Sequence, residues 1–373
     1  MIQKVFRGRG CIRRAPEMME KLGMKHPLIV GSARLTEKLR RLEGLEDAPV
    51  FSGYHPNPDL ADAWDGVKLY QERQCDGLIS LGGGSAMDTA KAVKSMLLAG
   101  SRENVLENRL EERPVPHLAI PGTAGSGAEA TANAVLYEAG QKLSLGHPCL
   151  LPEGVLLDAE LLDSLPEYHK KSCALDALSQ GIESYWARAA TEDSRVNAYL
   201  AILGVLDNLK AYLAGDPHAA EEMLDAAYQS GKAIFQTRTT AAHAMSYQLT
   251  KLLGLAHGHA CLLTLPVLWD LMCEREEERP LMRELASRMR LGDPLMGSRL
   301  LRGMLIDLGM EAPPMPAEET LERLTDSVNA ERLGNHPMPL DRAQIASVYR
   351  QAFRPILEPE RQACLDIWTY YGQ

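Results

Sequence analysis

The chain has 373 residues, enough for two domains with separate hydrophobic cores. Its formal net charge of −10 argues against general affinity for nucleic acids or anionic membranes, although it leaves room for a local cationic pocket. There is no signal-like N-terminus, no apolar run of about 18 residues and no C-x-x-C pair among the seven cysteines. We therefore expect a cytoplasmic protein with reduced thiols that binds neither nucleic acid nor membrane.

Short apolar runs alternate with amphipathic helical periods up to about residue 160. Strands are predicted around residues 28–30 and at 49–53, and helices at 34–45 and 60–74. Strands that alternate with helices predict a parallel sheet, whose ligands bind at the carboxyl ends of the strands. Residues 1–160 are therefore expected to form an α/β domain with a binding site along that edge.

A glycine-rich segment, GGGSAMDTAKAV, follows the strand predicted at 76–81 and opens a helix. Glycines let a phosphate approach the backbone closely, and the first N–H groups of a helix attract its charge. Asp88 and Lys91 lie on the first turns, within reach of a ribose or phosphate unless they form a solvated face. The alternative for the whole segment is a plain glycine-rich turn. The residues expected to form this diphosphate cradle are Gly82, Gly83, Gly84 and Ser85.

A second glycine-rich loop, PGTAGSGAEAT, follows the strand predicted at 117–120. Its hydroxyl residues Thr123 and Ser126 suit a second wall of the same nucleotide site. No G-x-G-x-x-G pattern follows the first strand, so a standard dinucleotide fingerprint does not carry this prediction. The sequence instead predicts a nucleotide site built from two glycine-rich loops.

Helical periods dominate from Pro166 onward, and we expect residues 161–373 to form an all-α domain. Within it, His243 and His257 lie among apolar residues, where a buried imidazole needs a partner. Asp176 and Gln180 are four residues apart, so both leave one face of a helix and are able to converge on the same ion.

One carboxylate, two imidazoles and a carboxamide oxygen suit a borderline divalent cation such as Fe²⁺ or Zn²⁺, with a position left for substrate. Either histidine taken alone is more often a core side chain with a satisfied hydrogen bond. Gln180 is expected to act as a weak fourth ligand or as a hydrogen-bonding neighbour of the ligands. The residues thus predict a metal site on the helical domain.

The order of these motifs resembles that of the iron-containing, or group III, alcohol dehydrogenase superfamily. The resemblance rests on GGGSAMDTAK, PGTAGSGAEAT, LLPEGVLLDAELLDSLP, D-A-L-x-x-x-I-E, and H-A-M followed by HGHA. It implies a Rossmann-like α/β nucleotide-binding domain with a parallel sheet, followed by an all-α domain, a fold shared with dehydroquinate synthase. It places the four metal positions on Asp176, Gln180, His243 and His257, where the second position is normally His, and it implies Fe²⁺ as the expected metal, with Zn²⁺ as the alternative.

Several longer segments, including SLPEYHKKSCALDALSQGIESYW and VNAERLGNHPMPL, resemble the phosphonoacetaldehyde reductase-like subgroup. That resemblance implies metal-dependent, NAD(P)H-linked reduction of a small anionic aldehyde, most simply phosphonoacetaldehyde to 2-hydroxyethylphosphonate. A metal would polarise the carbonyl oxygen as a Lewis acid. Its histidine ligands would then be catalytic, with Tyr247, His259, the cofactor ribose or metal-bound water as proton donor. Arg238, assisted by Lys142 and His147, is the expected phosphonate-binding group.

The cofactor is expected to be NADPH or NADH, with NADPH accepted and preferred. The first strand ends in Gly31 and Ser32, followed by Ala33 and Arg34, without the carboxylate that commonly binds the ribose 2′-hydroxyl of NAD. Three alternatives remain open: a general short-chain alcohol dehydrogenase or aldehyde reductase, a dehydroquinate synthase-like lyase, and a metal-free binding or regulatory protein. The expected assembly is a homodimer.

Overall fold

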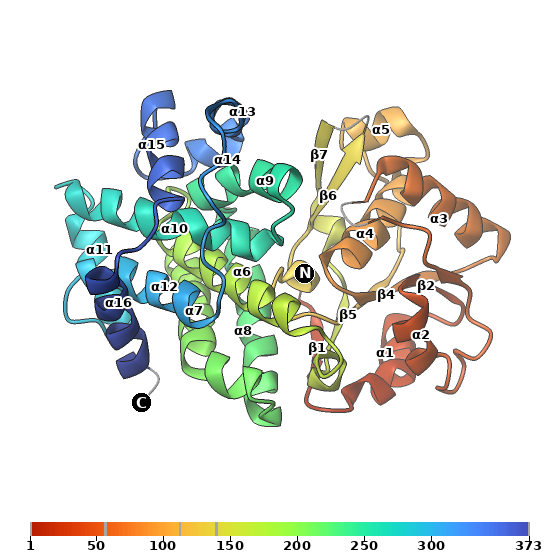
Figure 1. Cartoon of the computed structure of the whole chain (residues 1–373). Helices are drawn as coiled ribbons and strands as arrows, with labels where there is room; N and C mark the ends of the chain where they lie inside the picture. Colours follow the sequence, from red (N-terminus) through yellow and green to blue (C-terminus); the bar gives the residue numbers. More distant parts are fainter. Residues whose placement is uncertain (1, 56–57, 112, 139–140, 372–373) are drawn as a thin grey trace. The chain divides into compact units, whose positions relative to one another are not determined.

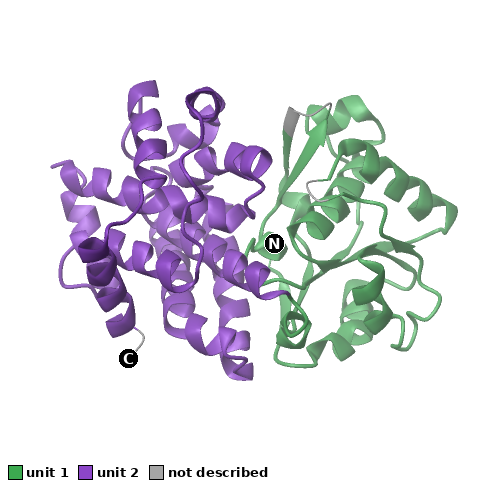
Figure 2. Ribbon diagram, in the orientation of Figure 1, with its two compact units in different colours: residues 1–165 green, residues 166–373 purple. Residues whose placement is uncertain are grey.

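The chain divides into two compact units, Met1–Leu165 and Pro166–Gln373 (Figure 2). The computed structural model describes residues 2–55, 58–111, 113–138 and 141–371. The domain boundary predicted at residue 160 falls within the short 3₁₀ helix η4 (Ala159–Leu162), near the end of the first unit. Each unit is described separately below.

The first unit is built on a six-stranded parallel sheet in the order β1-β8-β5-β4-β2-β3 (Figure 1). Its strands are β1 (Lys4–Arg7), β2 (Pro27–Gly31), β3 (Val50–Phe51), β4 (Gly77–Gly82), β5 (His117–Pro121) and β8 (Gly154–Leu157). The non-sequential strand order requires crossover connections, which the intervening helices supply. The predicted α/β class with a parallel sheet is confirmed.

Helices cover both faces of this sheet, so its central strands are buried on both sides. Leu28 of β2 packs into a core with α3 and α4, whereas the next residue, Ile29, packs into a core with α1 and α2. This alternation follows from the two-residue period of a strand. The helices are α1 (Ala15–Leu22), α2 (Ala33–Leu39), α3 (Leu60–Glu72), α4 (Gly84–Ala99) and α5 (Arg102–Leu106).

Two features of the first unit differ from the sequence prediction. The helix predicted at 34–45 ends at Leu39, because the following residues form turns and Gly44 has a positive φ of 77°. An antiparallel hairpin of β6 (Asn133–Glu138) and β7 (Gln141–Gly146) was not predicted. The remaining short elements are the 3₁₀ helices η1 (Cys11–Arg14), η2 (Ala128–Ala130) and η3 (Pro148–Leu150).

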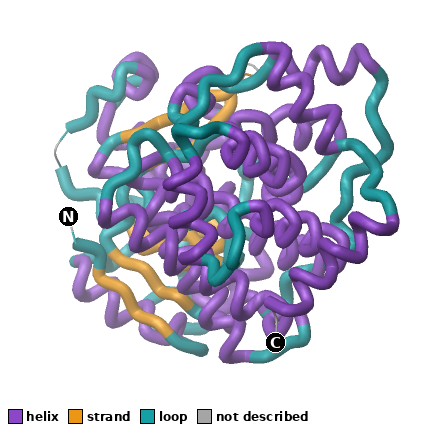
Figure 3. The backbone as a smooth tube through the Cα atoms, turned by 90° about the vertical axis from the view of Figure 1, so that its left-hand side faces the viewer, coloured by secondary structure: helices purple, strands orange, loops and turns teal. Residues whose placement is uncertain are grey.

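The second unit is helical throughout its described part, as predicted (Figure 3). Its two ligand-bearing helices, α6 and α10, are buried along most of their length. Among the described residues, no helix is both long and apolar enough to cross a membrane. The helices are α6 (Glu167–Trp186), α7 (Glu192–Leu213), α8 (Pro217–Thr237), α9 (Ala241–Leu253), α10 (His257–Glu274), α11 (Arg279–Arg288), α12 (Leu295–Asp307), α13 (Glu318–Asp326), α14 (Ala330–Gly334), α15 (Arg342–Ala352) and α16 (Glu358–Tyr371).

Candidate metal centre and nucleotide loops

Three helices of the second unit bring four potential metal ligands together. Asp176 comes from α6, His243 from α9, and His257 and Cys261 from α10; one ligand atom of each lies within 4.8 Å of all the others. His243 Nε2 is 3.3 Å and His257 Nε2 is 3.9 Å from Asp176 Oδ1. We call these four residues the ligand cluster.

Gly258 explains how α10 comes close enough to α6 to form this cluster. A Cβ at this position would overlap the carbonyl oxygen of Ser172 and would lie 2.6 Å from the backbone nitrogen of Asp176. Both atoms belong to the α6 backbone, which cannot yield as a flexible side chain would. A glycine after His257 is therefore required for the ligands of the two helices to meet.

Glu183 orients His243 from the side opposite the cluster. Its Oε2 is in short contact with His243 Nδ1, while its Oε1 accepts hydrogen bonds from Thr240 N at 3.0 Å, Thr240 Oγ1 at 2.8 Å and Ala242 N at 2.9 Å. With Glu183 accepting from Nδ1–H, a bound metal would take the lone pair of Nε2, the atom that faces Asp176. Glu183 is thus placed to favour the tautomer of His243 that binds a metal.

The charges around the cluster favour a cation. Burial alone would lower the pKa of His257, but Cys261 and Asp176 outweigh it and raise the pKa to about 9. Burial would raise the pKa of Asp176, yet the two histidines and a hydrogen bond from Gln180 hold it below its ordinary value. The two shifts show that the carboxylate and thiol groups attract positive charge at the imidazoles, a position that a divalent ion would take when the imidazoles are neutral.

The two glycine-rich loops lie against each other in the first unit. A Cβ on Gly83 would be 3.3 Å from Thr123 Cγ2, and one on Gly84 would be 3.3 Å from Ser126 Oγ. Gly83 is also the N-cap of α4 and has no side-chain hydrogen bond to the first turn, so a ligand oxygen can take that place. Gly83, Gly84, Thr123 and Ser126, together with Ser85, are partly exposed beside buried neighbours. The loops therefore present a polar, narrow surface suited to a phosphate.

Comparison with known proteins decides the family. The model for iron-containing alcohol dehydrogenase matches residues 3–159, and the model for the C-terminal domain of the Fe-containing alcohol dehydrogenase family matches residues 171–353. The chain belongs to the iron-containing alcohol dehydrogenase family. This confirms the predicted superfamily and the prediction of an enzyme of this oxidoreductase class.

Relatives in this family differ in substrate. The chain is 34% identical over 272 residues to phosphonoacetaldehyde reductase of Streptomyces viridochromogenes, which covers 69% of this chain and 67% of that protein. It is 32% identical over 265 residues to NAD-dependent methanol dehydrogenase of Bacillus methanolicus, covering 67% and 69% of the two chains. Sulfoacetaldehyde reductase of Bifidobacterium kashiwanohense, solved with NAD⁺, has a TM-score of 0.88 and 25% identity over 94% of this chain and 97% of its own. A nicotinamide cofactor and an iron-type metal, as predicted, are consistent with these findings.

Gln180, which stands where this dehydrogenase family normally has a histidine, contacts the cluster through Asp176. The hydroxyl of Ser230 donates to Gln180 Oε1 at 2.8 Å. An ionised carboxylate only accepts hydrogen bonds, so the Gln180 contact to Asp176 uses the amide N–H group. This geometry favours the hydrogen-bonding role predicted for Gln180 over the role of fourth ligand.

Two residues at the centre were missed by the sequence analysis. Cys261 lies one helical turn after His257, and Glu183 lies two turns after Asp176 at the end of the motif D-A-L-x-x-x-I-E. Both spacings place the missed residue on the same helix face as a predicted ligand. The sequence could have indicated both residues, because each is a second polar group on the helix face that carries a predicted ligand.

Tyr247 and His259, predicted as proton donors, occupy different surroundings. The Tyr247 ring stacks on His257 with 6.0 Å between centroids and 9° between planes. The His257 side chain is 40% exposed whereas Asp176 is 9% exposed, so His257 is the more solvent-accessible of these two members of the cluster. His259 Nδ1 instead lies 3.1 Å from the hydroxyl of Tyr168. Because it belongs to that contact and not to the ligand cluster, the predicted catalytic role of His259 gains no support.

The predicted substrate-binding residues also differ from one another. Arg238 follows α8 with a positive φ of 60° and forms an ion pair with Glu331, both side chains being more than half exposed. His147 Nδ1 accepts a hydrogen bond from Cys149 N at 3.2 Å and so caps its own turn. Lys142 lies in β7 opposite Tyr137, and its side chain lies outside the described part of the structure. Arg238 is thus the one described residue of the three that carries an exposed cation.

Lys91 was wrongly predicted as a cofactor contact, whereas the cofactor contact expected at Gly31 stays a prediction. Lys91 is fully buried, and its ammonium donates to Ala128 O at 2.6 Å, Thr131 Oγ1 at 3.0 Å and Asn133 O at 2.8 Å. Burial lowers the pKa of Lys91 to about 8. A Cβ on Gly31 would lie 2.5 Å from the carbonyl oxygen of Leu81, so the pairing of β2 with β4 requires this glycine.

Asp88 and Ser32 complete the predicted nucleotide residues. Asp88, on α4, accepts a hydrogen bond from Val135 N at 3.1 Å and so ties α4 to the hairpin. The ribose contact expected for Asp88 stays a prediction. Ser32 is exposed at the N-cap of α2, and its hydroxyl makes no capping hydrogen bond. Ser32 therefore remains a candidate for contact with the cofactor.

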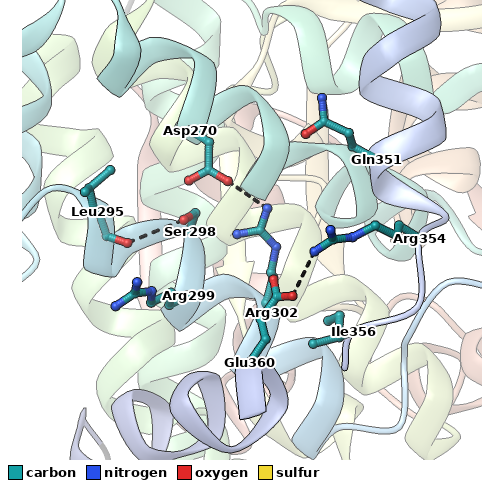
Figure 4. Close-up of a pocket in the computed structure, with 9 residues that line it drawn as sticks. All are labelled: Asp270, Leu295, Ser298, Arg299, Arg302, Gln351, Arg354, Ile356 and Glu360. Carbon is teal, nitrogen blue, oxygen red and sulfur yellow. Dashed lines mark hydrogen bonds and ion pairs between the residues drawn. The ribbon is translucent and has the colours of Figure 1, made fainter. Parts of the chain in front are cut away.

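The helical unit also contains a pocket of about 550 Å³, shown in Figure 4. None of its lining residues belongs to the ligand cluster. Arg302 pairs with Asp270 at 2.7 Å, and Arg354 pairs with Glu360 at 2.8 Å. Carboxylates thus already neutralise two of the arginines that line this pocket. We assign it no ligand.

Proposed function

We propose that this chain is a metal-dependent reductase of a small anionic aldehyde, with phosphonoacetaldehyde as substrate and NADPH or NADH as hydride donor. The ligand cluster carries the proposal, because buried carboxylate, imidazole and thiol groups converge on one point beside a solvent opening. The substrate class is supported by the phosphonoacetaldehyde and sulfoacetaldehyde reductases to which the chain is similar, since both names specify an aldehyde with an acidic group.

The donor set fits a divalent ion, with Asp176, His243 and His257 as the proposed holding residues. When bound, the ion supplies Lewis-acid polarisation of the aldehyde oxygen, and the nicotinamide supplies the hydride. Glu183 keeps His243 Nε2 free to bind by accepting the proton of Nδ1. Tyr247, stacked on the half-exposed His257, is the proposed donor of the proton that the product oxygen takes up. The glycine-rich loops around Gly83 and Ser126 are proposed to hold the cofactor diphosphate.

The substrate charge gives the first test. We expect kcat/KM for phosphonoacetaldehyde to exceed that for 3,3-dimethylbutanal, an uncharged aldehyde of similar size and shape, by at least about tenfold, which corresponds to about 1.4 kcal/mol. Replacing Arg238 by alanine should lower the value for phosphonoacetaldehyde alone, because a guanidinium can grip a phosphonate with two hydrogen bonds. Initial rates measured with both aldehydes check this expectation.

The matched control is Arg354→Ala, since Arg354 is also an exposed arginine of the helical unit that pairs with a carboxylate. It should leave both rates unchanged. If Arg238→Ala lowers the two rates equally, or lowers neither, Arg238 does not bind the anion. If the wild type prefers 3,3-dimethylbutanal, the chain is a general short-chain aldehyde reductase.

The cofactor preference gives the second test. No carboxylate lies at the end of β2, where Ser32 is exposed and Arg34 is within 3.4 Å of Ser164 Oγ. We expect NADPH to be preferred over NADH in kcat/KM, and Ser32→Asp to reverse the preference by at least about tenfold, since the new carboxylate would repel a 2′-phosphate. A wild-type preference for NADH above tenfold would contradict the proposal.

We also propose a homodimer in the cytoplasm as the working form of the enzyme. Sedimentation of the purified protein tests the assembly. Mass corresponding to one chain at assay concentrations would contradict it.

A further inference from the structure

We propose that the thiolate of Cys261 is the fourth protein ligand of the metal, in place of the histidine that the family normally has at position 180. The inference rests on the proposed metal-dependent function and specifies its donor set as one carboxylate, two imidazoles and one thiolate. Cys261 is fully buried on α10, with Sγ 3.9 Å from His257 Nε2. The other ligand atoms of the cluster all lie within 4.8 Å of it.

The distances between the ligand atoms suit a tetrahedral ion. Bonds of about 2.0 Å to nitrogen or oxygen and about 2.3 Å to sulfur place ligand atoms about 3.3 to 3.6 Å apart. The cluster shows 3.3 Å between His243 and Asp176, and 3.9 Å for both His257–Asp176 and Cys261–His257. The remaining pairs lie within 4.8 Å, so shifts of roughly 1 Å would bring all four atoms to the separations of one ion.

Gln180 is not placed to fill the same role. Its carbonyl oxygen accepts from Ser230 at 2.8 Å and its amide group donates to Asp176. To bind an ion through its oxygen, Gln180 would have to turn its amide and leave the buried Ser230 hydroxyl without this partner. Cys261 needs no such exchange, because its sulfur already faces the two imidazoles.

The thiolate would replace the metal-binding atom that is lost when glutamine stands at position 180, and it would add a negative charge. A donor set of Asp176, Cys261 and two neutral histidines carries two negative charges, which balance a divalent cation in a buried site. Metal binding releases the thiol proton to solvent as the bond to sulfur forms. Thiolate is a soft ligand that favours Zn²⁺, so the site should select Zn²⁺ over Fe²⁺ more strongly than it would without Cys261. Asp176, His243, His257 and Cys261 would together hold the ion, which would still polarise the aldehyde oxygen from the side of the half-exposed His257.

Cobalt substitution tests this ligand directly. The apoprotein would be titrated with Co²⁺ under anaerobic conditions while the near-ultraviolet spectrum is recorded, since a thiolate bound to Co²⁺ gives a charge-transfer band that nitrogen and oxygen ligands lack. We expect the wild type and Gln180→Ala to bind one Co²⁺ per chain with this band. Cys261→Ser should lose the band and bind at least about tenfold more weakly.

The matched control is Cys273→Ala, which removes a cysteine further along the same helix and outside the ligand cluster. It should keep both the band and the affinity of the wild type. Competition between Zn²⁺ and Fe²⁺ for the apoprotein should show a lower Zn²⁺ selectivity in Cys261→Ser than in this control.

The possible results distinguish a failure of the Cys261 assignment from a failure of the proposed metal-dependent function. Wild type that binds one Co²⁺ without the band overturns the Cys261 assignment and leaves the metal-dependent reductase intact. Wild type that binds no Co²⁺ overturns both. If Cys261→Ser does not fold, X-ray absorption of the wild-type zinc form decides, with a sulfur neighbour at about 2.3 Å expected and a shell of nitrogen and oxygen alone contradicting the proposal.

Discussion

His257→Ala should lose its metal and at least about 1000-fold in kcat/KM. The ion supplies several kcal/mol of transition-state stabilisation as a Lewis acid, and about 4 kcal/mol corresponds to a thousandfold change in rate. His257 is the most suitable ligand to replace, because its side chain is 40% exposed and its removal disturbs little packing. The measurements are metal content per chain and initial rates, with thermal unfolding as the check on folding.

Two variants make this result specific. His218→Ala removes an exposed histidine at the start of α8 and should change neither metal content nor rate. Gln180→Ala should keep the metal and part of the activity, because Gln180 contacts the site through Asp176. Full activity in metal-free protein would refute the metal mechanism altogether.

Glu183→Gln should weaken metal binding by about 10–100-fold, the usual effect of losing a partner that orients a ligand. The amide keeps the size of Glu183 but carries no charge, and at its nitrogen it cannot accept the proton of His243 Nδ1. His243 would then lose the interaction that fixes its tautomer. Titration of the apoprotein with Zn²⁺ measures the affinity, and activity should partly return at saturating metal.

The control for this variant is Glu284→Gln. Glu284 accepts a hydrogen bond from Tyr185 of α6 at 2.7 Å but has no contact with His243 among those described. It should bind metal as the wild type does. Equal affinities in Glu183→Gln and the wild type would show that Glu183 does not orient the ligand.

The fold was predictable because its signals are local. Strands such as β2 and β4 are short apolar runs bounded by turn residues, and the helical unit has sustained helical periods. The hairpin of β6 and β7 was missed because its burial alternates weakly and no tight-turn sequence was recognised between the strands. The end of α2 was missed because the turns that follow Leu39 keep the helical spacing of apolar residues up to Leu45.

The residues of the site that belong to a sequence motif could be predicted, whereas those that depend on how the helices pack could not. Asp176, His243 and His257 stood out by motif, and the structure brings them together. Which neighbour on α10 would face them depends on how α10 packs, so Cys261 did not stand out. The cofactor contact predicted for Lys91 was wrong for the same reason. The sequence shows how far Lys91 lies from the start of α4 but not in which direction its side chain points.

Because α10 approaches α6 closely at Gly258, the metal ligands are positioned during folding, before any metal binds. The contact at Gly258 leaves no room for a side chain, so it fixes the distance between the two helices. His257 therefore lies next to Asp176 as soon as the helical core forms. The conformational entropy of ordering these ligands is then lost during folding and not during metal capture. The centre is consequently pre-organised, and an ion should enter and leave it without unfolding the unit that holds it.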